Sequence, residues 1–257
     1  MDGKMVYFVG AGCGAPDLIT VRGDRLLRRA DVIIYAGSLV NPELLTTAKT
    51  SCEIYNSAVM TLEEVIEVMR QAEQEEKLTV RLHTGDPCLY GAIREQMDLL
   101  EELGISYEIV PGVSSFCGAA AAVKAEYTLP DVSQTVIISR MAGRTPVPDR
   151  EEIARLAEHQ ATMVLFLSTG LLEDLSVQLL RGGYSEDTPA ALVYKASWPD
   201  EKVCRCTVGT LLQTAKENKI SKTALVLVGR FLGDEYQRSK LYDPGFSHEF
   251  RKAENGN

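Results

Sequence analysis

Long hydrophobic runs are absent from this 257-residue sequence. No segment approaches the roughly 18 consecutive apolar residues of a membrane-spanning helix, so we expect no such helix. The chain does not open with a basic segment followed by an apolar stretch, so we expect no export signal and a cytoplasmic protein. The net charge of −9 argues against nucleic acid or an anionic membrane surface as a partner.

Motifs that bind metals or form disulfides are also lacking. The six cysteines form no C-x-x-C pair, and Cys204 and Cys206 share one face of an expected strand without other metal ligands nearby. The three histidines match no H-E-x-x-H spacing. We therefore expect free thiols in a reducing compartment and no bound metal ion.

Short apolar segments alternate with helical patterns in the first half of the chain. Strands are expected over residues 5–9, 31–36, 53–56, 78–82 and 107–110, and helices over 20–29 and 92–103. A capping-box pattern begins at Thr61 and precedes a further amphipathic helix. This alternation predicts a parallel sheet with helices on both faces.

The second half continues the alternation with a mixed sheet. Strands are expected over residues 135–139, 162–167, 190–194, 203–207 and 224–228, and helices over 116–123, 149–158 and 171–180. Residues 198–201 have the pattern of a hairpin turn. We predict two α/β domains, each a central sheet flanked by helices, over residues 1–113 and 114–233, followed by a loosely packed polar tail over 234–257.

A glycine turn follows the first expected strand as Gly10-x-Gly12-x-x-Ala15, the form of a dinucleotide-binding fingerprint. Two features disfavour NAD. Pro16 and the residues after it separate the turn from the helix that would face a pyrophosphate. The second strand ends without the carboxylate that would bind a ribose. An NAD-dependent oxidoreductase is thus a disfavoured alternative, and a tight turn that brings the backbone close to its neighbours is favoured.

Two more glycine-containing segments follow expected strands: T-G-D-P at residues 84–87 and P-G-V-S-S at residues 111–115. Each alone is typical of an ordinary turn. Ligands of open α/β sheets bind beyond the carboxyl ends of the strands, so three such ends predict a cleft. We expect the cofactor near Thr84 to Asp86, with the Gly10 turn shaping the cleft.

The segment R-M-A-G-R-T-P-V-P at residues 140–148 carries Arg140 and Arg144 on a loop that glycine and proline stiffen. Guanidinium groups suit carboxylates, although the spacing alone favours a solvent-exposed loop. No G-x-S-x-G or Walker pattern occurs. These absences fit a reaction that depends on positioning more than on covalent catalysis.

Taken together and in this order, the glycine-rich segments resemble the tetrapyrrole methylase family. The V-G-A-G-x-G-x-x-x-L-x-T block of its members matches residues 9–20, with Cys13 where most members have proline. The G-D-P turn matches residues 85–87, and the V-P-G-x-[ST]-[SA] block matches 110–115. The resemblance covers about residues 4–232 and is specific because the blocks occur together.

Further segments are most similar to members that methylate C11 of precorrin-4 or cobalt-precorrin-4. They are L-H-T-G-D-P at residues 82–87, L-Y-G-A-I-R-E-Q at 89–96, L-P at 129–130, V-S-Q-T at 132–135 and G-R-T-P-V-P at 143–148. Uroporphyrinogen methyltransferases carry an arginine where this chain has Ala92, and a histidine-containing block where it has residues 139–144. Both differences argue against that substrate.

The resemblance implies two α/β domains, a homodimer, and S-adenosylmethionine in the cleft between the domains, with S-adenosylhomocysteine as product. By position, the implied cofactor contacts are Cys13, Thr84, Gly85, Asp86, Leu89, Ser114, Ser115, Leu167, Ala196 and Ala224. Substrate carboxylates are expected to pair with some of Arg94, Arg140, Arg144 and Lys195, and Asp17 is a candidate base.

Three alternatives stay open beside this interpretation. The chain could methylate another precorrin carbon, act as a diphthine synthase of similar fold, or carry a tetrapyrrole or an adenosyl ligand without catalysis. The blocks around Arg94 and Pro148 favour corrin chemistry over diphthamide.

Overall fold

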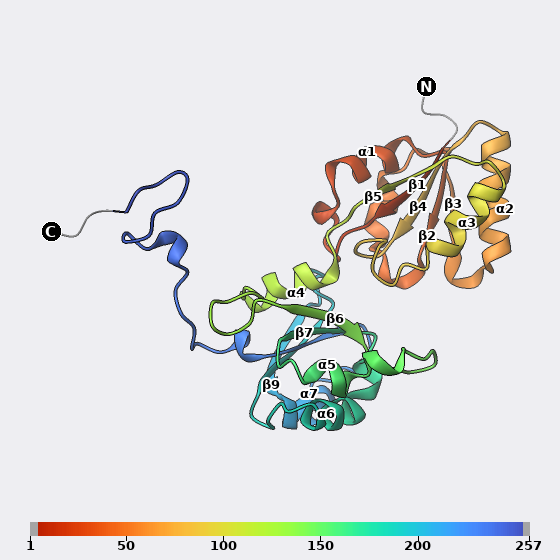
Figure 1. Ribbon diagram of the computed structural model, residues 1–257. Coiled ribbons are helices and arrows are strands. Elements are labelled where there is room, and N and C mark those ends of the chain that lie inside the picture. Colours follow the sequence, from red (N-terminus) through yellow and green to blue (C-terminus); the bar gives the residue numbers. More distant parts are fainter. Residues whose placement is uncertain (1–4, 254–257) are drawn as a thin grey trace. The chain divides into compact units, whose positions relative to one another are not determined.

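Figure 1 shows the computed structural model of the chain, which describes residues 5–253. The chain divides into two compact units. The first comprises the chain up to Ala119 together with Lys195–Glu201, and the second comprises Ala120–Tyr194 and the chain from Lys202 onward. The expected division after residue 113 and the expected polar tail stay predictions, and residues 254–257 of that tail lie outside the described residues.

The sheet of the first unit is parallel throughout, with the strand order β3-β2-β4-β1-β5. Its strands are β1 (Met5–Gly10), β2 (Val32–Tyr35), β3 (Glu53–Asn56), β4 (Leu78–His83) and β5 (Tyr107–Val110). Each lies where the sequence predicts it, to within one residue at either end. The order makes β4, β1 and β5 neighbours, so the three strands followed by glycine-containing segments end at one edge.

Helices cover both faces of this sheet (Figure 1). On one face, α1 (Val21–Arg29) packs Leu27 into a hydrophobic cluster with the strands. On the other face, α2 (Leu62–Gln74) packs Met69 into a second cluster, which α3 (Arg94–Glu102) completes. This arrangement confirms the predicted helix-covered parallel sheet.

Threonine caps begin the first two helices. Thr20 Oγ1 accepts a hydrogen bond of 3.1 Å from the backbone N–H of Gly23. Thr61 and Glu64 form the predicted capping box, with reciprocal bonds of 3.3 and 2.7 Å. The third helix begins two residues later than predicted, because Ala92 adopts a left-handed φ of 48° that cannot belong to a right-handed helix.

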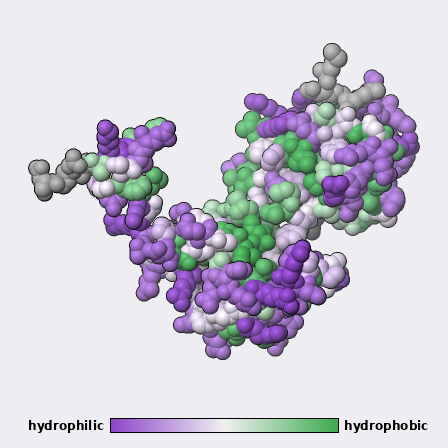
Figure 2. Space-filling model, viewed as in Figure 1, coloured by the Kyte–Doolittle hydropathy of each residue, from purple (hydrophilic) through white to green (hydrophobic). Residues whose placement is uncertain are grey.

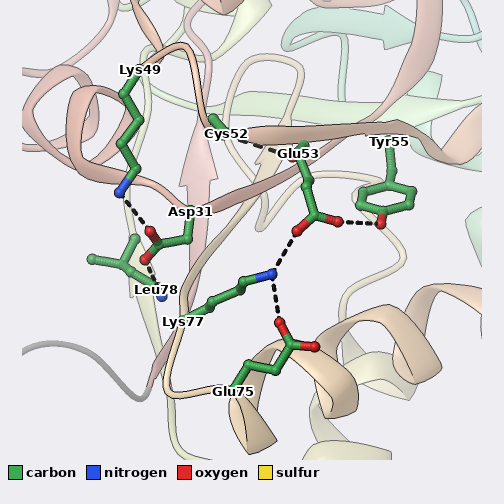
Figure 3. A network of polar contacts seen from close by, with 8 residues as sticks. All are labelled: Asp31, Lys49, Cys52, Glu53, Tyr55, Glu75, Lys77 and Leu78. Carbon is green, nitrogen blue, oxygen red and sulfur yellow. Dashed lines mark hydrogen bonds and ion pairs between the residues drawn. The ribbon is translucent and has the colours of Figure 1, made fainter.

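Charged residues join the amino ends of three strands of this sheet (Figure 3). Asp31, just before β2, accepts a bond of 2.9 Å from the N–H of Leu78 and pairs with Lys49 at 2.5 Å. Lys77, just before β4, pairs with Glu53 of β3 at 2.6 Å. Exposed ion pairs contribute little one by one. These ion pairs lie at the edge of the sheet opposite to the one where the glycine-containing segments lie.

The second unit has a mixed sheet with the strand order β6-β7-β10-β8-β9. Its strands are β6 (Val136–Arg140), β7 (Thr162–Phe166), β8 (Pro189–Tyr194), β9 (Lys202–Thr207) and β10 (Ala224–Val228). Only β6 and β7 pair in parallel, while the other neighbours are antiparallel. The antiparallel pairing of β8 with β9 confirms the predicted hairpin.

The longer helices of the second half are α4 (Ser115–Val123), α5 (Ile153–Ala157), α6 (Leu172–Arg181) and α7 (Leu211–Glu217). A single helix over 149–158 is wrong: Glu152 has an extended ψ of 140° and separates a 3₁₀ turn from α5. The sequence does not predict α7, whose seven residues bury only Leu211 and Ala215. So short a helix depends on its packing.

Short 3₁₀ helices lie in the connections: η1 (Pro16–Leu18), η2 (Gly37–Leu39), η3 (Pro42–Thr47), η4 (Ser57–Val59), η5 (Asp149–Glu151), η6 (Thr169–Leu171), η7 (Val208–Thr210), η8 (Arg230–Leu232) and η9 (Lys240–Tyr242). On the face shown in Figure 2, hydrophilic side chains cover much of the surface of each unit. No helix among the described residues is both long and apolar enough to cross a membrane.

Candidate functional site

Backbone hydrogen bonds join the ends of β1 and β4 beyond the strands themselves. The N–H of Ala11 donates to the carbonyl of His83 at 2.7 Å. Gly12 and Gly85 then exchange two bonds, of 3.2 and 2.9 Å. The turns that follow the two strands are therefore a single hydrogen-bonded structure.

The end of β5 meets the same structure at Gly112. A Cβ atom on Gly112 would lie only 2.2 Å from the carbonyl oxygen of Gly85. A Cβ atom on Gly10 would lie 2.6 Å from the same oxygen. Only glycine permits so close an approach. The Gly10 turn therefore lets backbones pack together, as the favoured interpretation of the motif requires.

Asp86 ties the end of β4 to the end of β5. Its Oδ2 accepts a hydrogen bond of 2.8 Å from the N–H of Gly112, and its Oδ1 accepts one of 2.8 Å from the N–H of Cys88. Partial burial raises the pKa of Asp86, but the bonds from Cys88 and Gly112 outweigh it and the net pKa is lowered. The ionised carboxylate holds the turn that begins at Thr84.

Polar groups suited to a ligand lie beside this junction. Thr84 Oγ1 is buried and has no hydrogen-bond partner within residues 5–253. The N and Oγ atoms of Ser115 lie 3.4 Å from the Cβ position of Gly85, and Ser114 is buried next to it. A buried hydroxyl without a partner is costly unless a ligand or water satisfies it. Five predicted cofactor residues, Asp86 included, thus lie together.

Cys13 lies in the same unit, where it contacts the segment of residues 195–201. Its buried sulfur accepts a hydrogen bond of 3.3 Å from Ser197 Oγ, which in turn accepts one of 3.0 Å from the N–H of Ala15. A Cβ atom on Gly118 would lie 2.8 Å from Cys13 Sγ and 3.4 Å from Ala196 Cβ. The structure therefore brings together Cys13 and Ala196, which are 183 positions apart in the sequence.

The contacts that Ser197 and Trp198 make here could not be predicted from the sequence. Trp198 is the only tryptophan of the chain, and the sequence indicates only a hairpin turn around it. A Cβ atom on Gly14 would lie 2.2 Å from Trp198 Cδ1, so the indole packs directly on that glycine. A large aromatic residue in a short turn was the available signal, because such a side chain gains stability by packing.

The second unit contributes Leu167 and Ala224 to the predicted set. Leu167 follows β7 with a left-handed φ of 52°, and its side chain is 67% exposed. Left-handed backbone at a non-glycine residue is frequent at binding sites. Ala224 is buried at the start of β10, where its carbonyl accepts a bond of 2.9 Å from Thr169 Oγ1.

The basic residues predicted for substrate carboxylates have different surroundings. In the first unit, Arg94 pairs with Asp98 at 2.8 Å, although its side chain is 83% exposed. Lys195 pairs with Asp200 at 2.7 Å, and its ammonium lies 5.3 Å from the centre of the Trp198 ring. Both cations have neighbouring carboxylates with which substrate groups would compete.

The two arginines of the 140–148 loop differ more sharply. The Arg140 guanidinium donates to three carbonyls of its own loop at 2.8 to 3.2 Å, so it closes the loop. Arg144 is exposed, and no acidic side chain of residues 5–253 pairs with it. Asp17 is exposed in η1. These substrate and base assignments stay predictions.

Comparison with known proteins decides the family. A model of the tetrapyrrole (corrin/porphyrin) methylases matches residues 5–212. The chain belongs to this family. A cobalt-precorrin-4 C(11)-methyltransferase of Methanocaldococcus jannaschii is 53% identical over 253 residues, covering 98% of each chain. A precorrin-4 C(11)-methyltransferase of Pseudomonas aeruginosa is 44% identical over 250 residues, covering 97% of this chain and 99% of the other.

Solved structures of tetrapyrrole methylases share the fold. That of a cobalamin biosynthetic enzyme, cobalt precorrin-4 methyltransferase, superimposes with a TM-score of 0.89 at 49% identity, covering 90% of this chain and 97% of that one. A uroporphyrin-III C-methyl transferase from Thermus thermophilus, complexed with S-adenyl homocysteine, has a TM-score of 0.72 at 26% identity, covering 89% and 93%. The predicted fold class and the resemblance to the family are confirmed.

Proposed function

We propose that this chain is an S-adenosylmethionine-dependent C-methyltransferase that methylates C11 of precorrin-4 or cobalt-precorrin-4 in corrin biosynthesis. The observation that carries the proposal is the 53% identity to a cobalt-precorrin-4 C(11)-methyltransferase over nearly the whole of both chains. The candidate site agrees with it. It lies at the carboxyl ends of adjacent parallel strands, where open α/β sheets bind ligands.

The residues around the junction of β1, β4 and β5 fit S-adenosylmethionine. The unpartnered hydroxyl of Thr84 and the N–H and hydroxyl of Ser115 offer hydrogen bonds to its polar groups. Asp86 keeps this surface in shape through its bonds to backbone N–H groups. We assign Cys13 and Ala196 to the same site, together with Gly85, Leu89, Ser114, Leu167 and Ala224.

The methyl group comes from the sulfonium of S-adenosylmethionine and passes by in-line displacement to an electron-rich ring carbon of the tetrapyrrole. The chain contributes alignment of the reactants and exclusion of water, which supply a large share of rate enhancement in well-oriented reactions. The sulfonium charge disappears in this step, so weakly polar surroundings favour it. The side chains of Leu89, Leu167 and Ala196 are of that kind.

The carboxylates of the tetrapyrrole are assigned to Arg94, Arg140, Arg144 and Lys195. Arg144 is the foremost of the four, because its guanidinium is exposed and pairs with no acidic side chain among residues 5–253. A guanidinium binds a carboxylate bidentately when it is not already paired. Loss of a substrate proton needs a base, for which Asp17 remains the candidate.

Two further parts of the proposal concern assembly and location. The family resemblance implies a homodimer. The chain is also assigned to the cytoplasm, where a reducing environment would keep the thiols of its six cysteines free.

The product of the reaction tests the proposed function. The full chain is incubated with methyl-labelled S-adenosylmethionine and either precorrin-4 or cobalt-precorrin-4, and the product is analysed by mass spectrometry and NMR. We expect one added methyl group, at C11. A methyl group at another carbon would assign the chain to a different step, and binding of both ligands without transfer would indicate a carrier. Faster methylation of cobalt-precorrin-4 than of precorrin-4 would show that the natural substrate already holds cobalt, and the reverse would show that it does not.

A further inference from the structure

Arg81 of β4 is a buried arginine without a carboxylate partner. The residue is 6% exposed, and the ion pairs among residues 5–253 do not include it. Burial lowers the pKa of Arg81 to about 10, so its guanidinium stays charged at neutral pH. A buried charge that no opposite charge neutralises is costly.

The guanidinium binds two neutral acceptors. Its Nε donates to Oε1 of Gln96 at 3.1 Å, and one terminal nitrogen donates to the carbonyl of Ile34 at 3.2 Å. Gln96 is itself 5% exposed, and its Nε2 donates to the carbonyl of Ala92 at 2.8 Å. An arginine can only donate hydrogen bonds. Arg81 therefore fixes the orientation of the Gln96 amide. The amide oxygen faces Arg81, and the NH₂ group faces the carbonyl of Ala92.

The carbonyl held by Gln96 belongs to a strained turn over residues 87–93. Tyr90 and Ala92 have left-handed φ angles of 57° and 48°. Between them, a Cβ atom on Gly91 would lie 2.2 Å from the carbonyl oxygen of Pro87, so the turn is folded tightly on itself. Backbone of this kind persists only where its surroundings hold it in place. The bond from Gln96 is such a restraint.

This turn follows Thr84 to Asp86 and joins them through the bond from the Cys88 N–H to Asp86, and it contains one further assigned cofactor residue, Leu89. Residues 84–86 are fixed by the bonds between Gly12 and Gly85 and by those that Asp86 accepts. The next turn instead presents the half-exposed ring of Tyr90, and the exposed Arg94 follows it at the start of α3. The two residues lie four positions apart in the chain, and an aromatic ring and a guanidinium are side chains that suit a flat macrocycle that carries carboxylates.

We propose that Gln96, oriented by buried Arg81, is a positioning residue that holds the turn of residues 87–93 in the shape that contacts the tetrapyrrole. The inference rests on the proposed function, since it assigns this turn to the tetrapyrrole side of the same site. Gln96 touches no reactant itself and acts through the carbonyl of Ala92.

The variant Gln96→Glu removes the hydrogen-bond donor of the side-chain amide and keeps an acceptor. Its carboxylate still accepts from Arg81, and more strongly, but cannot donate to Ala92. We expect the KM for the tetrapyrrole to rise roughly fivefold, as for one lost hydrogen bond. The affinity for S-adenosylhomocysteine should change less than the tetrapyrrole KM, because Leu89 is the one assigned cofactor residue in this turn, and the melting temperature should not fall. Hydrogen–deuterium exchange should become faster over residues 87–93 and stay unchanged over residues 84–86.

The exposed Gln74→Glu change, at the end of α2, is the matched control and should leave every measurement at its wild-type value. An unchanged tetrapyrrole KM and exchange rate in Gln96→Glu would overturn the inference. So would a joint loss of melting temperature and S-adenosylhomocysteine affinity, which indicates a structural role alone. If the wild type methylates neither tetrapyrrole, the proposed function fails. The exchange rates of residues 87–93 then decide by themselves whether Gln96 positions the turn.

Discussion

A Cβ atom on Gly10 would lie 2.5 Å from the Cα atom of Gly112, so the turns after β1 and β5 meet backbone against backbone. The approach of Gly112 to the carbonyl oxygen of Gly85 is closer still, at 2.2 Å from the Cβ position. Neither contact involves a flexible side chain that could move aside. The junction thereby supports Thr84 and Ser115 on closely packed backbone.

Gly112→Ala should therefore lower the free energy of unfolding by about 3 kcal/mol, the upper end of the usual cost of overpacking. Urea denaturation measures the loss. Gly170→Ala is the matched control, since nothing lies within 4 Å of its Cβ position, and it should change stability by less than about 0.5 kcal/mol. Equal stabilities of the two variants would contradict the backbone packing described here.

Thr84→Val tests whether the unpartnered hydroxyl serves a ligand. We expect unchanged or slightly higher stability, because no bond within the described chain is lost, and about tenfold weaker binding of S-adenosylhomocysteine. The control is Thr162→Val, since Thr162 Oγ1 donates to the carbonyl of Tyr127 at 2.8 Å. It should cost about 1 kcal/mol of stability and leave that affinity unaltered. Calorimetry of both variants gives the comparison, and wild-type affinity in Thr84→Val would remove Thr84 from the site.

The stability of the protein should decline in mild acid because of His83. Burial, followed by the charge of Arg81, lowers the pKa of His83 to about 3. The unfolded chain takes up this proton below about pH 6.5, whereas the folded chain does not until about pH 3. The contribution of His83 to the free energy of unfolding is therefore fully present above pH 6.5 and falls as the pH decreases toward 3.

Denaturant unfolding between pH 7 and pH 4.5 measures this decline, with a slope of up to about 1.4 kcal/mol per pH unit from one proton. His83→Gln should flatten the profile by that amount, whatever its stability at pH 7. His159→Asn, which alters an exposed histidine, should keep the wild-type slope. A profile that stays equally steep in His83→Gln would show that other groups cause the decline.

Arg144→Ala should raise the KM for the tetrapyrrole about tenfold, because a charge-assisted bond to a carboxylate is lost. The affinity for S-adenosylhomocysteine and the value of kcat should stay near those of the wild type, as for binding energy common to ground and transition states. Arg150→Ala removes another exposed arginine of the same region and should have no effect. Unchanged tetrapyrrole affinity in Arg144→Ala would show the assignment to be wrong.

The strands of the first sheet could be predicted from the sequence because each is a short apolar segment with turn residues on both sides. The cap of α2 could be predicted as well, because it depends only on Thr61 and Glu64. The break at Glu152 and the whole of α7 could not. Helices of five to seven residues are stabilised by packing rather than by their own pattern.

The cofactor residues were predicted unevenly. Thr84 to Asp86 stood out because glycine and aspartate follow a buried strand directly. The part played by Ser197 and Trp198 did not, because a hairpin turn explains their composition equally well. Buried Arg81 gave no local signal either, since an arginine within a strand does not reveal whether it faces solvent or the core.

The sequence by itself determined the α/β character of the chain, its three glycine-containing strand ends and its family. These properties depend on periodicity and on the local order of residues. Only the tertiary structure decided that β4, β1 and β5 are neighbours, that Gln96 is oriented by Arg81, and that Ser197 accepts a bond from Ala15 182 positions away. The physical reason is that such contacts form between side chains that meet only when the core packs, and no local pattern records which distant segments will meet.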